Sequence, residues 1–247
     1  MTKIRQAFIF AAGRGERMRP ITDSIPKPLV KINGKSIIDY TIQKLNLLND
    51  IEKIIVNGFH LSSQIEEHLK NLQNPKIIFS GEQTKVETGG GLLFAAPKLN
   101  FNEPILLING DILWQEEDNI SDLELIIKNY DLKESDILLG LKRKEEVINA
   151  DDAIIRGDFN FNPATKELSK PQNQELDYLF IGIQIINPKI LADSPEAPFS
   201  MNYFYKKALN KNFTLTGIKG IEMTGRFFHI DSVAAIEVAT RNLCHNI

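Results

Sequence analysis

Residues 7–30 have the sequence A-F-I-F-A-A-G-R-G-E-R-M-R-P-I-T-D-S-I-P-K-P-L-V, and the rest of the chain is organised around this stretch. Its first four residues form an apolar run, which predicts a buried strand. Gly13 and Gly15 follow the strand. Glycine adopts positive φ easily and lets a ligand approach the backbone. The turn is therefore predicted to bind an anion through its amides.

Charge around this turn favours a phosphate ligand. Between Gly13 and Lys31 there are five cationic and two anionic residues, a local net charge of +3, whereas the whole chain carries −3. Glycine turns after a first strand are also common in α/β proteins, so a purely structural turn is the alternative. Two familiar phosphate-binding patterns are absent: Met18 stands where G-x-G-x-x-G needs its last glycine, and there is no G-x-x-x-x-G-K-[S/T].

Composition indicates an ordinary globular protein that needs no disulfides. The chain has 247 residues, of which 43% are hydrophobic and 25% charged. Cys244 is the only cysteine, which excludes an intramolecular disulfide and a cysteine-cluster metal site. No apolar run is long enough to span a membrane, and no signal peptide is visible at the N-terminus. We expect a cytoplasmic protein that binds neither membranes nor, given its acidic balance, nucleic acid.

The first half of the chain predicts alternating strands and helices. Strands are expected over residues 7–10, 53–57, 76–79 and 104–109, and helices over 36–45, 62–69 and 92–97. A polar, glycine-rich loop at 81–91 is expected before the third helix. This alternation is typical of βαβ units and a parallel sheet. We therefore expect an α/β fold with a doubly wound, mixed but mainly parallel sheet, and a nucleotide-binding half over about residues 1–111.

The second half has a more varied pattern. Helices are expected over 122–130, 199–209 and 233–243, and strands over 136–142, 179–186, 213–217 and 227–231. Residues 153–169 contain short extended pieces that suggest a small β-hairpin excursion. There is no internal repeat or flexible linker. The expectation is a single domain over 1–247, with residues 112–247 as the half that binds the second substrate.

Three polar residues are candidates for chemistry at strand ends. Asp111 directly follows the buried strand 104–109 in an Asn-Gly-Asp turn, and it could be a Mg²⁺ ligand or simply a turn residue. Asp231 ends a late strand and could complete a metal site or cap the next helix. Pro26 and Pro28 bracket Lys27, which predicts a stiff, extended position for this lysine. Carboxyl ends of parallel strands meet at one edge, so these residues could share a cleft.

Other polar features receive simpler interpretations. Thr88 and the three glycines after it expose amides before a helix, which favours contact with an anion or a base edge, although a mobile surface loop is the alternative. His60 and His68 are interpreted as structural or solvent-exposed. Trp114 is expected to pack near the cleft rim.

The longer pattern resembles a known family. G-x-G-x-R-M-x-P-x-T followed by P-K-P-L is similar to the signature of the sugar-nucleotide pyrophosphorylases, nucleotidyltransferases that join a nucleoside triphosphate to a sugar 1-phosphate. The resemblance covers nearly the whole chain and is strongest over 7–32 and 87–111. It implies a Rossmann-like, GT-A-like nucleotidyltransferase domain.

The resemblance also implies roles for particular residues. Arg17 would neutralise the triphosphate, Lys27 would reach the attacking phosphate, and Asp111 and Asp231 would hold Mg²⁺. The implied nucleotide-binding residues are Ala11, Ala12, Gly13, Arg14, Gly15, Glu82, Thr88 and Gly89. The implied sugar-phosphate-binding residues are Asn109, Gly157, Asp158 and Lys170.

Two departures from the family pattern keep alternatives open. Where the family has W-x-D-x-G-T, this chain has His229 for the tryptophan and no glycine after Asp231; where many members have E-K-P, it has Ser169 before Lys170. The resemblance implies UTP and N-acetylmuramate 1-phosphate, used in cell-wall recycling, as substrates. GTP with mannose 1-phosphate is the alternative pair, and an inactive nucleotide-sugar-binding protein is a second class. Either a monomer or a small homo-oligomer fits the sequence.

Overall fold

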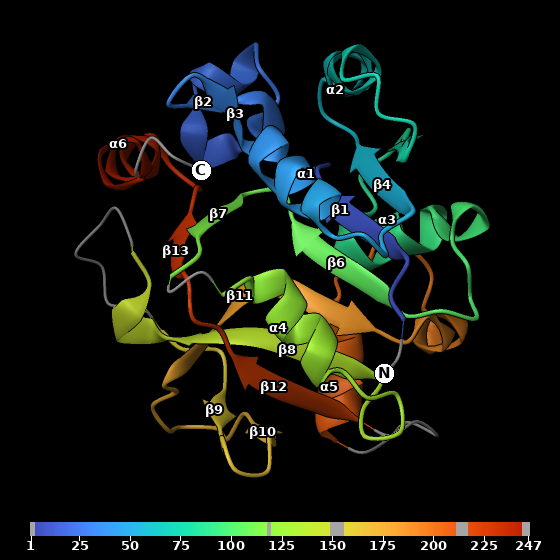
Figure 1. The fold of residues 1–247 in the computed structure, drawn as a ribbon, viewed down its shortest axis with the longest axis vertical. Helices are drawn as coiled ribbons and strands as arrows, with labels where there is room; N and C mark the ends of the chain where they lie inside the picture. The colour runs from blue at the N-terminus through green and yellow to red at the C-terminus, as the bar shows by residue number, and fades with distance from the viewer. Residues whose placement is uncertain (1–2, 118–119, 149–155, 211–216, 244–247) are drawn as a thin grey trace.

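The computed structural model describes residues 3–117, 120–148, 156–210 and 217–243 (Figure 1). Seven strands form one sheet in the order β12-β8-β11-β6-β1-β4-β5. Their bounds are β1 Gln6–Phe10, β4 Lys53–Gly58, β5 Ile77–Gly81, β6 Ile105–Asn109, β8 Ile137–Arg143, β11 Tyr178–Ile186 and β12 Ile218–Glu222. Within this sheet only β11 runs against its neighbours, β6 and β8. The predicted mixed, mainly parallel sheet is confirmed.

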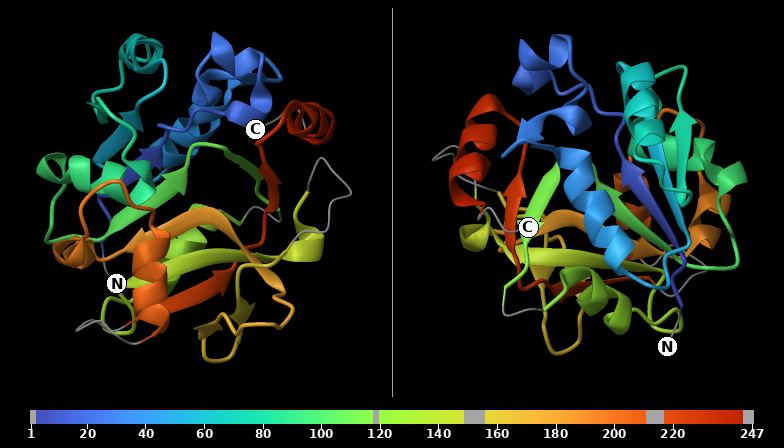
Figure 2. Two further views of the ribbon diagram at one scale, coloured as in Figure 1. Left: turned by 180° about the vertical axis from the view of Figure 1, so that it is seen from behind. Right: turned by 45° about the horizontal axis from the view of Figure 1, so that its top comes forward.

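Helices cover both faces of the sheet, as expected for a doubly wound fold (Figure 2). Their bounds are α1 Ile37–Leu47, α2 Ser62–Asn71, α3 Glu87–Phe94, α4 Asp122–Asn129, α5 Asn202–Leu209 and α6 Val233–Asn242. Helices α1, α2 and α4 share one apolar core with the sheet, and α3 and α5 share the other. Alternation along β1 explains the two cores, because Ala7 and Ile9 enter the first while Phe8 enters the second.

The carboxyl ends of β1 and β6 lie side by side. The two strands pair in parallel with Phe10 opposite Asn109, and the Gly110 amide donates to the Phe10 carbonyl at 2.9 Å. A Cβ on Gly110 would lie 2.5 Å from the Phe10 oxygen, so this close approach requires glycine. The glycine turn after β1 and the Asn-Gly-Asp turn after β6 therefore meet at one edge of the sheet, as predicted.

A two-stranded antiparallel ribbon, absent from the sequence predictions, joins the late part of the chain to this edge. It consists of β7 (Ile112–Gln115) and β13 (Arg226–His229). The Ile230 amide donates to the Asp111 carbonyl at 2.8 Å, which brings Asp231 beside Asp111. Helix α6 follows, and the Ser232 side chain accepts from the Ala235 amide at its N-terminus. Ser232 therefore supplies the side-chain cap, and Asp231 faces the cleft.

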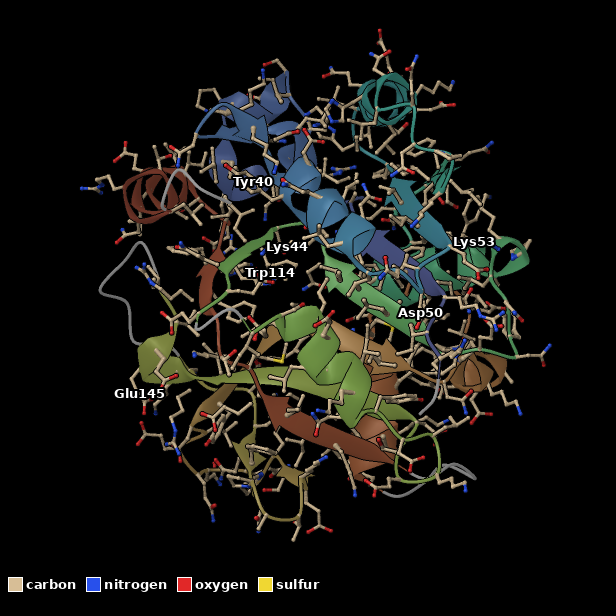
Figure 3. All side chains as sticks on the ribbon, in the orientation of Figure 1. Tyr40, Lys44, Asp50, Lys53, Trp114 and Glu145 are labelled. Carbon is tan, nitrogen blue, oxygen red and sulfur yellow. The ribbon has the colours of Figure 1, made fainter. Side chains whose placement is uncertain are left out.

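Trp114 of β7 is part of the core rather than the cleft rim. It is 2% exposed and stacks on Phe227 at a centroid distance of 6.1 Å. The ammonium of Lys44 on α1 lies 5.1 Å from the centre of the Trp114 ring, and both side chains are labelled in Figure 3. This packing fixes the ribbon against α1 and so fixes the position of the Asp111 and Asp231 ends.

Three segments differ from the predictions. Helix α3 begins at Glu87, so the glycines of T-G-G-G are helical instead of forming a loop. Lys27 begins a 3₁₀ turn instead of an extended segment, because the Leu29 amide donates back to the Pro26 carbonyl at 2.8 Å and Pro28 has no amide to satisfy. The expected strand at 213–217 lies almost entirely outside the described residues.

Two other expectations concern the second half. The hairpin excursion is present as β9 (Asn160–Phe161) paired with β10 (Leu168–Ser169). Its expected start at 153–155 and Cys244 lie outside the described residues. The remaining short elements are β2 Lys31–Ile32, β3 Lys35–Ser36 and the 3₁₀ turns η1 Glu16–Met18, η2 Ile21–Asp23, η3 Lys27–Leu29, η4 Ala96–Lys98, η5 Lys144–Glu146 and η6 Pro188–Asp193.

Asp122 at the start of α4 provides a stability test. Its carboxylate is buried and accepts hydrogen bonds from the amides of Thr224 and Gly225 at 2.9–3.2 Å. Burial raises the pKa of Asp122 above its usual range. Asp122→Ala should lower the free energy of unfolding by about 2–4 kcal/mol, because buried donors lose their acceptor. Urea denaturation measures the change, with the exposed Asp50→Ala expected to stay within about 0.5 kcal/mol of wild type; equal losses in both variants would contradict the assignment.

Candidate active site

A cleft of about 570 Å³ opens at the carboxyl ends of β1, β4 and β6. It brings together most of the residues that the sequence singled out. Those that line it are Ala11, Ala12, Gly13, Arg14, Gly15, Arg17, Lys27, Glu82, Thr88, Asn109, Asp111 and Asp231. Gly89, Gly157, Asp158 and Lys170 do not line it.

The glycine turn is held from below by Thr22. Gly15 has φ +64°, and a Cβ there would lie 2.8 Å from Thr22 Cγ2. Thr22 is buried and its hydroxyl donates to the Gly15 carbonyl at 2.7 Å. No atom lies within 4 Å of the position that a Cβ on Gly13 would take. The turn therefore combines a fixed Gly15 with an open Gly13.

Sequence reasoning gave Thr22 no role, although it stands in the R-M-x-P-x-T pattern. Thr22→Val keeps the shape of the side chain but removes the donor to Gly15. We expect KM for the nucleoside triphosphate to rise about 10-fold while kcat changes less than about 3-fold, because ground-state binding by the turn is what weakens. Thr22→Ser retains the hydroxyl and should stay near wild type. An unchanged KM in Thr22→Val would contradict the role assigned to Thr22.

Two cation–carboxylate pairs lie on the cleft wall. Lys27 Nζ is 2.9 Å from Asp111 Oδ2, and Arg17 Nη1 is 2.7 Å from Asp231 Oδ2. His229 stands between the carboxylates, with Nε2 at 3.4 Å from Asp111 Oδ2 and Nδ1 at 3.7 Å from Asp231 Oδ2. Both cations therefore lie where a phosphate chain bound at the glycine turn would need neutralisation.

The two pairs differ in exposure. The Lys27 side chain is 10% exposed, whereas that of Arg17 is 69% exposed. Burial raises the pKa of Asp111, but hydrogen bonding with His229 and the charge of Lys27 outweigh burial and hold that pKa well below its usual range. Asp111 is thus a fixed carboxylate beside a fixed ammonium, and Arg17 is free to follow a ligand.

The carboxylates fit a Mg²⁺ ion that arrives with a nucleotide. Across the part of the chain that the structure describes, no group of three or more His, Cys, Asp or Glu residues could hold a metal by itself. Mg²⁺ is commonly bound by one or two carboxylates together with substrate phosphates and water. Asp111 and Asp231 supply two such carboxylates, so the donor set suits Mg²⁺ shared with a triphosphate.

A buried polar pair forms the opposite side of the cleft. The Ala11 amide donates to Asn57 Oδ1 at 2.6 Å, and Asn57 Nδ2 donates to Glu82 Oε1 at 2.6 Å. Burial raises the pKa of Glu82, and the hydrogen bond from Asn57 opposes this shift. Asn57 was missed at the sequence level. The available signal was its position as a polar residue near the end of the buried strand β4.

Two further lining residues were also missed. Phe59 follows β4, and the guanidinium of Arg14 lies 5.5 Å from the centre of its ring. Lys85 lies in the segment before α3 and adds a third exposed cation to the lining. Both residues stand in loops at the carboxyl edge of the sheet, which is the only signal that the sequence offered.

Thr88 and Gly89 serve packing in the first turn of α3. The Met201 amide donates to Thr88 Oγ1 at 3.0 Å. A Cβ on Gly89 would lie 2.4 Å from the Phe199 ring, so the missing side chain lets α3 pack against this phenylalanine. Thr88 lines the cleft and Gly89 supports it from behind.

The candidate sugar residues gather around β11, outside the cleft lining. A Cβ on Gly157 would lie 2.0 Å from the Leu176 carbonyl oxygen. Asp158 Oδ2 accepts from the Phe180 amide at 3.2 Å, and burial raises the pKa of Asp158. Lys170 Nζ lies 5.3 Å from the centre of the Phe159 ring. The structure thus shows structural contacts for these residues, and their contact with a ligand stays a prediction.

The two histidines singled out earlier make structural contacts. His60 Nε2 lies 2.9 Å from the Thr22 carbonyl oxygen, and His68 Nε2 lies 2.7 Å from Asp39 Oδ1. His60 therefore helps to fix the segment under the glycine turn, and His68 joins α2 to α1.

The sequence profile of the nucleotidyl transferase family matches residues 6–196. The chain belongs to this family. N-acetylmuramate alpha-1-phosphate uridylyltransferase of Caulobacter vibrioides is 30% identical over 206 residues, which cover 81% of this chain and 83% of that protein. The protein of the same name in Neisseria meningitidis serogroup B is 41% identical over 111 residues, 44% of this chain and 47% of that protein.

Solved structures support the fold. The inositol-1-phosphate CTP transferase from T. maritima superimposes with a TM-score of 0.75 at 17% identity, covering 97% of this chain and 96% of that one. The predicted family and the Rossmann-like nucleotidyltransferase fold are confirmed. None of the helices within the described ranges is both long and apolar enough to cross a membrane.

Proposed function

We propose that this protein transfers a uridylyl group from UTP to a sugar 1-phosphate, forming a UDP-sugar and pyrophosphate. The observation that carries the proposal is the arrangement of two cation–carboxylate pairs, Lys27 with Asp111 and Arg17 with Asp231, beside the glycine turn. A triphosphate needs both cations and amides at the same place. The uridylyltransferase relatives support UTP as the donor.

The reaction needs positioning and charge neutralisation rather than a covalent enzyme intermediate. A phosphate oxygen of the sugar 1-phosphate attacks the α-phosphorus of UTP, and the bond from that phosphorus to the β-phosphate oxygen breaks as pyrophosphate leaves. Amides of Ala12, Gly13 and Gly15 hold the triphosphate. Lys27 orients the attacking phosphate and Arg17 neutralises the pyrophosphate side.

Mg²⁺ held by Asp111 and Asp231 would add positive charge at the phosphate oxygens. His229 lies within hydrogen-bonding reach of Asp111, and this contact orients the carboxylate. The mobile Arg17 and the fixed Lys27 then differ in task, because only Arg17 is exposed enough to move with the departing group.

We propose N-acetylmuramate 1-phosphate as the sugar substrate, since two relatives are named for this reaction. Residues up to about 111 would bind UTP, and residues from 112 onward, including Gly157, Asp158 and Lys170, would meet the sugar phosphate. Because UTP is a cytoplasmic metabolite, we place the enzyme in the cytoplasm. Either a monomer or a small homo-oligomer fits this proposal.

A panel assay tests the proposal. Pyrophosphate release is measured with Mg²⁺ for UTP, GTP, CTP and dTTP, each with N-acetylmuramate, N-acetylglucosamine, glucose or mannose 1-phosphate. We expect release with UTP and N-acetylmuramate 1-phosphate. Release only with GTP and mannose 1-phosphate would overturn the substrates and keep the reaction. Silence throughout would favour a nucleotide-sugar-binding protein and direct attention to the altered segment after Asp231.

A further inference from the structure

The polar pair beside the cleft has a fixed hydrogen-bond direction. A backbone amide can only donate, so the Ala11 amide requires Asn57 to turn its carbonyl oxygen toward it, at 2.6 Å. The NH₂ group of Asn57 must then face Glu82, whose Oε1 accepts at 2.6 Å. Asn57 is 1% exposed and Glu82 6% exposed. Neither side chain has room to choose another partner.

Helix α3 closes this pair from the other side. A Cβ on Gly91 would lie 2.6 Å from Glu82 Oε1 and 2.7 Å from Asn57 Nδ2. The missing side chain at Gly91 therefore leaves just enough space for the hydrogen bond. The pair is a packed part of the cleft wall, and the Glu82 orientation is set by its neighbours before any ligand arrives.

The other carboxylate oxygen of Glu82, Oε2, is the one that a ligand can reach. Within the described residues it accepts no hydrogen bond, and Glu82 lines the cleft. An ionised carboxylate is an acceptor only. The cleft therefore presents a hydrogen-bond acceptor at this position, and Asn57 determines that it does.

We propose that Asn57 is a positioning residue that fixes the hydrogen-bond polarity of residue 82, so that the site selects nucleobases presenting an N–H donor at that position. This inference rests on the proposed function, because it requires a nucleotide in the cleft. Uracil, thymine and guanine each carry a ring N–H on the pairing edge. Cytosine carries an unprotonated ring nitrogen there and would face Glu82 acceptor to acceptor, which disfavours CTP.

Exchanging the two polar groups tests the polarity directly. In Glu82→Gln, the Asn57 NH₂ holds the glutamine carbonyl, so the glutamine NH₂ faces the cleft and a donor replaces the acceptor. In the double variant Asn57→Asp/Glu82→Gln, Asp accepts from both Ala11 and the glutamine NH₂, so the glutamine carbonyl faces the cleft again. The control Asn57→Ala/Glu82→Gln leaves the glutamine amide without a fixed direction.

The readout is the ratio of UTP to CTP preference, measured as binding constants with Mg²⁺ by titration calorimetry and as kcat/KM with N-acetylmuramate 1-phosphate. Glu82→Gln should lower this ratio about 10- to 100-fold. The double variant with Asp should restore it to within about 3-fold of wild type, and the control with Ala should not. A purely structural role for Asn57 would change thermal stability without this restoration.

The outcomes separate the inference from the proposed function. If wild type prefers UTP but both double variants behave alike, the role of Asn57 is wrong and the proposed function stands. Equal binding of UTP and CTP by wild type would also overturn the inference. If wild type binds UTP selectively yet forms no UDP-sugar, the proposed reaction fails while the binding ratios still decide the role of Asn57. Circular dichroism melts confirm that each variant is folded.

Discussion

Asp111→Asn should lower kcat/KM for nucleotidyl transfer by about 10²- to 10³-fold. The substitution keeps the shape of the side chain but removes the negative charge that holds Lys27 at 2.9 Å and that would bind Mg²⁺. Both the ion and the lysine then lose their fixed position relative to the phosphates. Pyrophosphate release with Mg²⁺ and saturating UTP measures the change.

The fold should survive this substitution. An asparagine oxygen can still accept from Lys27, and the backbone contact between Ile230 and Asp111 is unaffected. The thermal transition should therefore shift by only a few degrees. Asp50→Asn is the matched control, since Asp50 is exposed in the turn after α1 and does not line the cleft (Figure 3). Activity of Asp111→Asn close to that of Asp50→Asn would rule out a catalytic role for Asp111.

Lys27→Met should also lower kcat/KM by about 10²- to 10³-fold. Methionine keeps much of the length and apolar stem of the buried lysine but removes the charge, so Asp111 loses its ammonium partner and the attacking phosphate loses its cation. Lys27→Arg restores the charge with a different shape and should recover only part of the activity, because the narrow site holds a point-like ammonium. Initial rates at several sugar phosphate concentrations separate binding from turnover.

Lys31→Met is the control for this second substitution. Lys31 lies four residues further on, is exposed in β2, and does not line the cleft. Its loss lowers the local positive charge by the same amount, so it reports any general electrostatic effect on nucleotide attraction. Similar losses in Lys27→Met and Lys31→Met would show that net charge, rather than the Lys27–Asp111 pair, supports activity.

The first half of the fold could be predicted because its signals are local. Apolar runs bounded by turn residues placed β4 and β6 within one residue of their observed bounds. Helix α3 was misplaced because glycine disfavours helices. Its glycines are instead required by tertiary contacts: Gly89 meets Phe199, and Gly91 meets the Asn57–Glu82 pair.

The ribbon of β7 and β13 was only half predictable. Residues 227–231 alternate as a strand should, but Ile112–Gln115 follows β6 so closely that it reads as part of one turn. Its partner lies more than 100 residues away, and no local pattern records such a pairing. The metal candidates Asp111 and Asp231 were nevertheless both recognised, because each stands at the end of an apolar strand.

Residues that act through hydrogen bonds to the backbone escaped the sequence. Thr22 holds the Gly15 carbonyl and Asn57 holds the Ala11 amide. Neither has a charge or a reactive group, so its type and spacing carry no chemical signal. Their role exists only because the fold places β4 beside β1 and the 3₁₀ turns beneath the glycine turn.

The most direct test of nucleotidyl transfer is the balance of products from UTP labelled at the α-phosphate, with Mg²⁺ and N-acetylmuramate 1-phosphate present. The account predicts one UDP-N-acetylmuramate for each pyrophosphate released, with the label in the sugar nucleotide and none in inorganic phosphate. Omission of the sugar phosphate should abolish pyrophosphate release. Release of labelled UMP without a sugar nucleotide, or UTP binding without any bond cleavage, would contradict the central claim.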